Sequence, residues 1–466
     1  MWNFDKIITE SSDFIWTYIL IALLIGTALY FTFRLRFVQF AHLKEMIKLL
    51  GETTKKDKDN SVSSFQAFTI SLASRVGTGN MAGVATAIAI GGPGSIFWMW
   101  IIALIGAASG FAESTLAQLF KRPGKRSFIG GPAYYMQHGL GKRWMGILFS
   151  ILITITFGLV FNSVQSNTIS FAFEESFGID RMLSGGIITL FTLIVIFGGI
   201  HRIAQVSSVI VPFMAVGYIV LAVGIVLMNI GELPRVIKLI VTSAFGMEQV
   251  IGGGLGVALM QGIRRGLFSN EAGMGSAPNA AATADVSHPV KQGYIQSLGV
   301  FTDTLLICSC TAFIILFSDV YTNSDLDGIK LTQAALVNEI GPAGGLFISI
   351  AIFFFAFSSI IGNYYYGETN IQFISKKPIY LLLYRIIVAL MVMGGSILSL
   401  KTVWNLADLF MGLMAIINLI AILALSRYVY IALKDYNMQK KAGIKSPNFK
   451  ASSMPDIQDE LPCWKD

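Results

Sequence analysis

The sequence predicts an all-α, polytopic membrane protein with about eleven transmembrane helices, ten of them in two inverted five-helix repeats. Three observations support this prediction. Apolar residues make up 54% of the 466 residues and charged residues only 13%, whereas a soluble chain carries about 25% charged residues. The apolar residues occur in long runs, near the ~20 residues that span a bilayer. Two runs contain a G-x-G interruption, Gly77-Thr78-Gly79 and Gly273-Met274-Gly275, 196 residues apart.

Eleven apolar runs are candidates for membrane spans. The first is too long for a signal peptide and no small-residue cleavage site follows it, so we expect a membrane helix that ends at Arg34 and Arg36. The seventh is the least regular, because Gly252 to Gly254 and Arg264-Arg265 indicate that part of it leaves the hydrocarbon or faces water. The expected spans are 14–33, 64–90, 95–119, 145–170, 183–200, 205–228, 250–284, 294–317, 343–369, 379–399 and 404–426.

Lysine and arginine are distributed unevenly over the loops between these runs. Alternate loops carry 24 of the 34 Lys and Arg residues, the opposite loops carry six, and four lie within spans. Because cytoplasmic loops are rich in Lys and Arg, we expect the C-terminus in the cytoplasm and the N-terminus outside. The protein is expected to be a multi-pass protein of the cell membrane, which is the inner membrane in a bacterium.

An odd number of spans per repeat reverses the orientation of the second repeat. The expected organisation is an extra N-terminal helix with a basic cytoplasmic segment (1–63), a first five-helix repeat (64–228), a second, inverted repeat (229–426) and a cytoplasmic tail (427–466). Each repeat then opens with an interrupted helix. Broken helices are tolerated at membrane depth only around a protein-lined or wet cavity, and paired breaks point to the binding site of a transporter.

Metal-ligating residues and overall charge exclude several other classes of protein. Three cysteines and four histidines are too few and too poorly spaced for a disulfide framework or a metal cluster. We therefore expect no cofactor. The net charge of +7 is attributed to basic loops facing the lipid bilayer, and no nucleic-acid partner is expected. A membrane-embedded enzyme would need converging catalytic groups within a span, and no such motif is present in the sequence.

The first interruption is predicted to bind both an anion and a cation. It reads Val76-Gly77-Thr78-Gly79-Asn80. Where the helix resumes, the N–H groups of Thr78 and Gly79 and the positive end of the helix dipole suit a carboxylate. The free carbonyls from Ala73 to Val76, with the side-chain oxygen of Asn80, suit Na⁺. The alternative is a kink or a tight helix crossing, since small residues are common in membrane helices.

The second interruption is predicted to complete the site for an α-amino acid. A carboxylate held by amides, together with an ammonium group near carbonyl oxygens, describes the zwitterion of such a substrate. Gly275 and Ser276 after the break, with Ser269 and Asn270 before it, are expected to supply the complementary contacts. The ring of Phe268 is expected to form a wall for the substrate's side chain.

The ninth run carries two adjacent hydroxyl groups at its middle. Ser358 and Ser359 are candidates to complete a Na⁺ shell with the carbonyls of the first interruption. The alternative is that both serines bond the carbonyls of their own helix, as serines in helices often do. The residues alone leave both interpretations open.

Charged residues within the spans are candidates for function because a charge at membrane depth is costly. Arg75, beside the first interruption, is placed to pair with Glu113, Glu271 or Asp303. Asp303 is a candidate ligand for a coupling ion or a site of protonation. Glu113 lies so near Lys121 that extension of its side chain toward the cytoplasm is the alternative. Glu113 and Asp303 also follow their respective glycine pairs by comparable distances.

Three motifs closely resemble the alanine or glycine:cation symporter family. They are Ser74–Ala89 (SRVGTGNMAGVATAIA), Gly91–Trp100 (GGPGSIFWMW) and Arg265–Pro278 (RGLFSNEAGMGSAP), and the resemblance covers roughly residues 60–430. It implies a sodium-coupled importer of small neutral amino acids that works by alternating access. It also implies the inverted-repeat fold shared by the neurotransmitter:sodium symporters. A proton-coupled amino acid transporter is the alternative, and the oligomeric state stays open.

The resemblance implies roles for individual residues. The amides after Gly77 would hold the substrate carboxylate, and the carbonyl of Val76 with the hydroxyls of Ser358 and Ser359 would hold Na⁺. One departure concerns Asn363, because alanine-type members tend to have tryptophan at this position, where it lines the side-chain pocket. Asn363 would leave a larger, more polar space, so we expect serine or glutamine to be accepted besides alanine and glycine.

Overall fold

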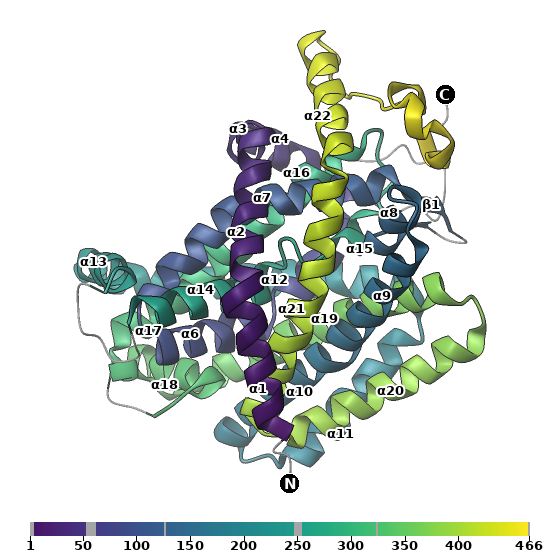
Figure 1. Ribbon diagram of the computed structural model, residues 1–466. Helices are drawn as coiled ribbons and strands as arrows, with labels where there is room; N and C mark the ends of the chain where they lie inside the picture. The colour runs from purple at the N-terminus through teal and green to yellow at the C-terminus, as the bar shows by residue number, and fades with distance from the viewer. Residues whose placement is uncertain (1–3, 53–61, 125–126, 247–253, 323–324, 465–466) are drawn as a thin grey trace.

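The protein is a bundle of long helices, described by a computed structural model for residues 4–52, 62–124, 127–246, 254–322 and 325–464 (Figure 1). Within these residues, the only paired strands are β1 (Arg122–Pro123) and β2 (Phe128–Ile129), which form a small antiparallel hairpin. The predicted all-α fold class is confirmed. The apolar runs form helices because a membrane helix bonds all its backbone groups within one segment.

In the part of the chain that the structure describes, eight helical stretches are long and apolar enough to cross a membrane, and each overlaps one of the expected spans. The other three expected spans are the two interrupted helices and α11 (Arg181–Ile196), which has 16 residues. The count of eleven and the repeat boundaries therefore stay predictions. The eight stretches are Lys6–Arg34, Gly94–Leu119, Arg143–Phe177, Gln205–Met228, Pro289–Ser318, Pro342–Ile374, Pro378–Ile397 and Leu400–Ala424.

Several of these stretches contain a π-helical turn, which widens the helix locally and is frequent at functional sites. The first stretch consists of α1 (Phe4–Ile15), η1 (Trp16–Leu20) and α2 (Ile21–Arg34). The other composite stretches are α9 (Arg143–Ile153), η3 (Thr154–Phe161) and α10 (Asn162–Phe177), and α16 (Pro289–Val300), η4 (Phe301–Cys308) and α17 (Ser309–Ser318). The regular long helices are α7 (Gly94–Leu119), α12 (Gly199–Met228), α19 (Pro342–Ile374), α20 (Pro378–Ile397) and α21 (Leu400–Ala424).

Short helices that the apolar runs do not predict connect the long helices or follow the last of them. Their sequences are amphipathic or polar, so they leave no long apolar signal. They are α3 (Val38–Ala41), α4 (Leu43–Leu50), α8 (Pro132–His138), α13 (Leu233–Ala244), α18 (Gly328–Ile340), α22 (Ser426–Lys441), and the 3₁₀ turns η5 (Val320–Thr322), η6 (Ala451–Ser453), η7 (Pro455–Glu460) and η8 (Pro462–Trp464).

Both interrupted helices lie in the buried interior. The first consists of α5 (Ser64–Arg75), a break, η2 (Gly79–Gly83) and α6 (Val84–Gly91). The second consists of α14 (Leu255–Asn270), a break and α15 (Ala277–Ala281), while residues 250–253 of the expected seventh span lie outside the described residues. The breaks contact each other, because a Cβ added to Gly79 would lie 3.1 Å from the Cα of Ser269.

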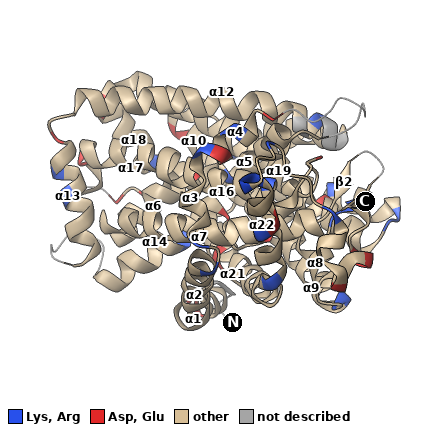
Figure 2. Cartoon of the chain, turned by 90° about the horizontal axis from the view of Figure 1, so that it is seen from above, with Lys and Arg blue, Asp and Glu red and all other residues tan. Residues whose placement is uncertain are grey.

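The described termini lie at opposite ends of the bundle (Figure 1). The end that carries α3, α4 and α22, here called the basic end, also carries many Lys and Arg residues (Figure 2). The C-terminal segment folds back onto this end, where the indole of Trp464 donates to the carbonyls of Gln118 (3.2 Å) and Leu119 (3.1 Å). The predicted tail is therefore a packed part of the molecule.

Candidate functional site

The first interruption is closed by two side-chain amides. Val76 has an extended conformation (φ −79°, ψ 92°), which ends α5. The N–H of Gly77 donates to Asn80 Oδ1 at 2.9 Å, and the N–H of Thr78 donates to Gln165 Oε1 at 3.1 Å. The Thr78 amide, predicted to bind a carboxylate, thus lies against an oxygen acceptor from α10.

The predicted sodium ligands come together on one side of the first interruption. The hydroxyl oxygen of Ser359, on α19, lies 2.9 Å from the carbonyl oxygen of Ala73 and 3.3 Å from that of Val76. It also lies 3.1 Å from the carbonyl oxygen of Phe355, in its own helix. Among the described residues, the hydroxyl of Ser358 bonds only this last carbonyl, at 2.8 Å. The two interpretations of the serine pair thus both apply to Ser359, which joins its own helix to the break.

The second interruption is held by a carboxylate from α7. Glu271, Gly273 and Gly275 have positive φ angles of 58°, 90° and 85°, which turn their amides away from a helical path. Glu113 accepts from the N–H of Gly273 (3.2 Å), the N–H of Gly275 (3.0 Å) and the side-chain amide of Asn418 (2.8 Å). Glu113 is fully buried, so the alternative that it extends toward the cytoplasm is wrong. Its three donors compensate its charge locally.

A second buried carboxylate, Asp303, lies at the first interruption. Asp303 Oδ1 accepts from the side-chain amide of Asn80 at 2.7 Å, and Asp303 Oδ2 accepts from the hydroxyl of Ser269 at 2.6 Å. Asn80 also donates to Ser269 Oγ at 3.0 Å. Glu113 and Asp303 were matched in sequence by their spacing from the glycine pairs. Each of them contacts the interruption that belongs to the other predicted repeat.

A polar cluster lies between the two interruptions and α19. Ser74 Oγ lies 2.7 Å from Glu271 Oε1 and 2.7 Å from Asn363 Oδ1. Ser276 donates to Glu271 Oε2 at 2.6 Å. Two predicted substrate residues, Asn363 and Ser276, therefore share one network. The approach is close, because a Cβ on Gly362 would lie 3.0 Å from the backbone nitrogen of Ser74.

Three predicted substrate residues carry a buried polar atom without a hydrogen-bond partner among the described residues. These atoms are Thr78 Oγ1, Asn270 Nδ2 and Asn363 Nδ2. The other side-chain atom of Asn270, Oδ1, accepts from the N–H of Ala272 at 3.0 Å and so caps the end of α14. Buried polar atoms are nearly always paired in folded proteins, so unpaired ones call for an explanation.

Phe268 belongs to an aromatic wall beside the first interruption. Its ring centroid lies 4.5 Å from that of Phe161 and 4.7 Å from that of Trp404. Gly79 faces this wall, since a Cβ there would lie 3.0 Å from Phe268 Cδ1. An aromatic cluster is present around Phe268, and its role as a wall for the substrate's side chain stays a prediction. Phe161 and Trp404 were not predicted as members because each comes from a different long helix.

The predicted ion pair of Arg75 is not observed. Within the described residues, its guanidinium makes no ion pair, and its one hydrogen bond goes to the carbonyl of Gln296 at 3.3 Å. Its Nε and Nη2 atoms are buried without partners there. The three candidate carboxylates, Glu113, Glu271 and Asp303, are instead held by amides and hydroxyls. Each carboxylate therefore accepts short hydrogen bonds from amides or hydroxyls in place of an ion pair with Arg75.

The position of Arg264 and Arg265 in the seventh run suggested that they face water. The structure shows that they do not. Both are buried within the protein, at 8% and 4% exposure. Arg265 forms an ion pair with Asp408 of α21 at 2.5 Å, and Arg264 pairs with Asp13 of α1 at 2.7 Å. The guanidinium of Arg265 also lies over the ring of Trp404 at 4.5 Å. These contacts attach α14, the first half of the second interrupted helix, to the first and last long helices.

A helical membrane protein whose two interrupted helices meet in its interior, with carbonyl oxygens gathered at one break, belongs to the class of secondary transporters. The family follows from comparison with known proteins. Residues 1–451 match the model of the sodium:alanine symporter family, and the chain belongs to this family. The protein is therefore a sodium-coupled amino acid symporter and not an enzyme.

Similar proteins cover nearly the whole chain. The chain is 56% identical over 460 residues to "Probable sodium/glutamine symporter GlnT" of Bacillus subtilis (strain 168), covering 99% of this chain and 96% of that protein. It is 54% identical over 463 residues to "Amino-acid carrier protein AlsT" of the same organism, covering 99% and 98%. A solved structure of a Na⁺-coupled sialic acid symporter aligns with a TM-score of 0.47 at 16% identity, covering 86% of this chain and 80% of that one.

Proposed function

We propose that the protein imports a small neutral amino acid together with Na⁺ and that glutamine is among its substrates. The observation that carries the proposal is the position of the Ser359 hydroxyl, within 3.3 Å of the carbonyl oxygens of Ala73 and Val76. Unwound carbonyls and hydroxyls are the ligands with which such transporters bind Na⁺. The Phe355 carbonyl lies beside them, 3.1 Å from the same hydroxyl, and completes an all-oxygen set.

Sodium at this position would couple to movement of the interrupted helix. Its ligands come from α5 on one side and from α19 on the other, which belong to different predicted repeats. A cation shared by both helices favours the arrangement in which they touch, and its release removes that preference. A ligand shifts a conformational equilibrium only by its differential affinity for the two states, and shared ligands provide such a difference.

The substrate's charged groups would bind at the two interruptions. Its carboxylate would take the amides of Thr78 and Gly79, replacing the bond that Thr78 makes with Gln165. Its ammonium group would bind at Ser269, whose hydroxyl lies 2.6 Å from the carboxylate of Asp303. The chain thus offers donors to the anionic group and acceptors to the cationic group of a zwitterion.

The substrate's side chain would be selected by Asn363. Its Nδ2 is buried without a partner among the described residues, and its Oδ1 is already bound to Ser74. A free N–H donor matches the carbonyl oxygen of a glutamine side chain or the hydroxyl of serine, and an aliphatic side chain leaves it unpaired. A buried donor left unpaired costs about 1–3 kcal/mol. The relative named as a sodium/glutamine symporter is in keeping with this proposal.

Competition for uptake tests the substrate proposal. Proteoliposomes with the purified protein and a fixed inward Na⁺ gradient take up labelled glutamine, and unlabelled alanine, glycine, serine and glutamine are added in turn. We expect glutamine and serine to compete at least as well as alanine. Competition by alanine and glycine alone would refute the role of Asn363 and leave sodium coupling in place.

Proton coupling is the second candidate, and the buried carboxylates favour it. Among the described residues, Glu113, Glu271 and Asp303 have no ion-pair partner and lie at the interruptions. Uptake that depends on an imposed pH gradient and is independent of the Na⁺ gradient would show proton coupling, with one of these carboxylates as the proton-binding group. Replacement of external Na⁺ by choline at constant pH distinguishes the two cations.

The orientation is part of the proposal. The C-terminus lies at the basic end and the described N-terminus at the opposite end (Figure 1). Because Lys and Arg mark the cytoplasmic side, we place the C-terminus in the cytoplasm and the N-terminus outside. Reporter domains fused to each terminus test this placement, and an active periplasmic reporter at the C-terminus would refute it.

A further inference from the structure

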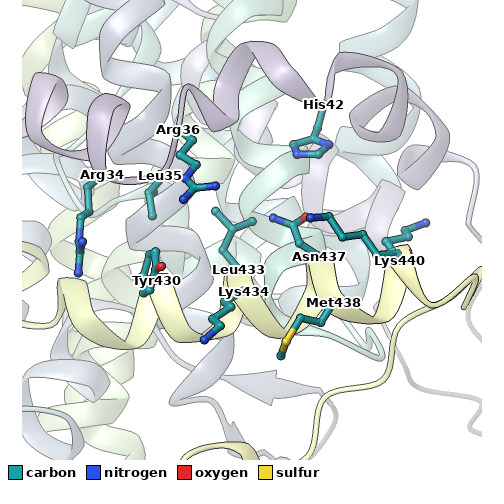
Figure 3. A pocket seen from close by; sticks show the side chains of 11 residues that line it. Arg34, Leu35, Arg36, His42, Tyr430, Leu433, Lys434, Asn437, Met438 and Lys440 are labelled. Atoms are coloured by element: carbon teal, nitrogen blue, oxygen red, sulfur yellow. The ribbon is translucent and has the colours of Figure 1, made fainter.

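A basic pocket lies at the basic end, and none of its described lining residues belongs to the two interrupted helices. It has a volume of about 610 Å³ and is formed by the end of α2 with the following turn on one side and by α22 on the other. Five of its lining residues are cationic: Arg34, Arg36, Lys434, Lys440 and Lys441. Among the described residues that line it, none is Asp or Glu. Side chains from both walls lie around the space between them (Figure 3).

Most of this positive charge is not neutralised by the protein. Lys440 pairs with Glu45 at 2.5 Å, and the guanidinium of Arg34 lies over the ring of Tyr430 at 4.5 Å. Within the described part of the chain, Arg36, Lys434 and Lys441 have no carboxylate within ion-pair distance. Like charges gathered in one pocket repel one another, so the arrangement is favourable when an anion lies between them.

The turn that carries Arg36 has an unusual backbone. Arg36 and Phe37 both have a φ angle of 56°, in the left-handed region that side chains other than glycine seldom adopt. The turn is held by the bond from the N–H of Phe37 to the carbonyl of Thr32, at 2.7 Å. It brings Arg36 to the pocket and directs the chain into α3. Strained residues of this kind are found preferentially at ligand clamps and active sites.

The pocket adjoins a surface suited to lipid. Arg34 is the last residue of the first membrane stretch, Lys6–Arg34. Beyond it, α3 and α4 leave large apolar side chains exposed, with Phe40 at 41%, Leu43 at 42% and Ile47 at 62%. Lys44 and Lys48 on α4 are exposed as well. A short amphipathic helix with apolar and basic exposed residues lies in the interface of a membrane. The pocket therefore opens at the depth of the lipid headgroups.

We propose that this pocket binds the phosphate headgroup of an anionic phospholipid from the adjoining leaflet. Arg36, Lys434 and Lys441 would contact the phosphate, and the apolar lining residues Leu35 and Leu433 would contact the glycerol region. Basic pockets beside membrane helices bind anionic headgroups in this way. This lipid site is separate from the proposed amino acid and Na⁺ sites. The bound lipid would contact α22, the helix that follows α21.

Lipid binding to the purified full-length protein tests the proposal. Native mass spectrometry in detergent measures the apparent affinity for phosphatidylglycerol and for phosphatidylcholine with the same acyl chains. We expect phosphatidylglycerol to bind at least about tenfold more tightly, since several cations act on its net charge. Equal affinities would overturn the proposal. Inorganic phosphate in excess is the second arm, and full displacement of the lipid by it would show a site for free phosphate instead.

Two double variants of equal charge change locate the site. Arg36→Gln with Lys434→Gln removes two pocket cations, and Lys44→Gln with Lys48→Gln removes two exposed cations of α4. The pocket variant should lose at least about tenfold in affinity for phosphatidylglycerol, and the α4 variant less than about threefold. Equal losses would show general attraction to the surface and overturn the proposal. The comparison of two lipids on the unsubstituted protein stands even where a variant fails to fold.

Discussion

Replacement of Ser359 by alanine tests the proposed sodium site at its centre. Its hydroxyl is the one side-chain group that contacts the carbonyls of both Ala73 and Val76, at 2.9 and 3.3 Å, in the described part of the chain. The substitution removes one oxygen ligand and the link between α19 and the first interruption. The carbonyl of Phe355 stays in place, so the variant retains part of the ion's shell.

The expected loss of Na⁺ affinity in Ser359→Ala follows from the charge of the bound Na⁺. A hydrogen bond or equivalent contact to a charged group contributes about 1.5–3 kcal/mol. Because about 1.4 kcal/mol corresponds to a factor of ten in affinity, Ser359→Ala should raise the Na⁺ concentration for half-maximal uptake about 10-fold to about 150-fold. Within the described residues, the hydroxyl of Ser358 bonds the carbonyl of Phe355 in its own helix and no carbonyl of the first interruption. Ser358→Ala is therefore the matched control, with an expected change of less than about threefold.

The assay is initial uptake of labelled amino acid into proteoliposomes over a range of external Na⁺, at constant ionic strength. Maximal uptake at saturating Na⁺ checks that each variant is folded and reconstituted. An unchanged Na⁺ dependence in Ser359→Ala would refute the assignment of Na⁺ to this side of the break. A larger effect in Ser358→Ala than in Ser359→Ala would refute the distinction between the two serines.

Three other substitutions test separate parts of the site. Gly79→Ala should lower uptake at least about fivefold without loss of membrane insertion, because the new Cβ would lie 3.1 Å from Ser269 Cα and such overpacking costs about 1–3 kcal/mol. Asn363→Trp should lower the ratio of glutamine to alanine uptake at least about tenfold, by filling the pocket and removing a donor. Asp408→Asn should lower the stability in a denaturation assay by about 3–5 kcal/mol, since it leaves Arg265 buried without its ion-pair partner.

Each of these substitutions has a control and a contradicting result. Gly83→Ala adds a Cβ at an ordinary 3.6 Å from Trp404, so it should retain uptake, and an equal loss would contradict the steric explanation. Asp13 is 56% exposed, so Asp13→Asn should cost less than about 1 kcal/mol; equal losses in both aspartate variants would contradict the role of the buried pair. An unchanged glutamine-to-alanine ratio in Asn363→Trp would remove that residue from the substrate pocket.

Features with a local signal could be predicted from the sequence. The long helices follow from runs of apolar residues, and the breaks follow from Gly77-Thr78-Gly79 and Gly273-Met274-Gly275, because glycines beside polar residues stand out within such runs. The serine pair at 358 and 359 stands out for the same reason. The residues left its pairing with the first interruption as one of two alternatives, and the family resemblance favoured that pairing, since nothing local to α19 identifies the helix it faces.

Features that depend on distant partners could not be predicted. Gln165 binds the Thr78 amide from 87 positions away, and Asp408 pairs with Arg265 across 143 positions. Asn418 binds Glu113 across 305 positions. Each is visible in sequence as a polar residue in an apolar run, which marks it as a candidate without naming its partner. Arg265 was misjudged for this reason, because a buried arginine and a water-facing one look alike until the paired carboxylate is known.

The central claim is that Na⁺ drives amino acid uptake through the paired interruptions. The most direct measurement is accumulation of labelled glutamine in proteoliposomes with an inward Na⁺ gradient. It is compared with accumulation in choline at the same pH and the same membrane potential. The account predicts accumulation above the external concentration with Na⁺ and background uptake when choline replaces it. Accumulation that persists in choline and follows an imposed pH gradient would contradict it.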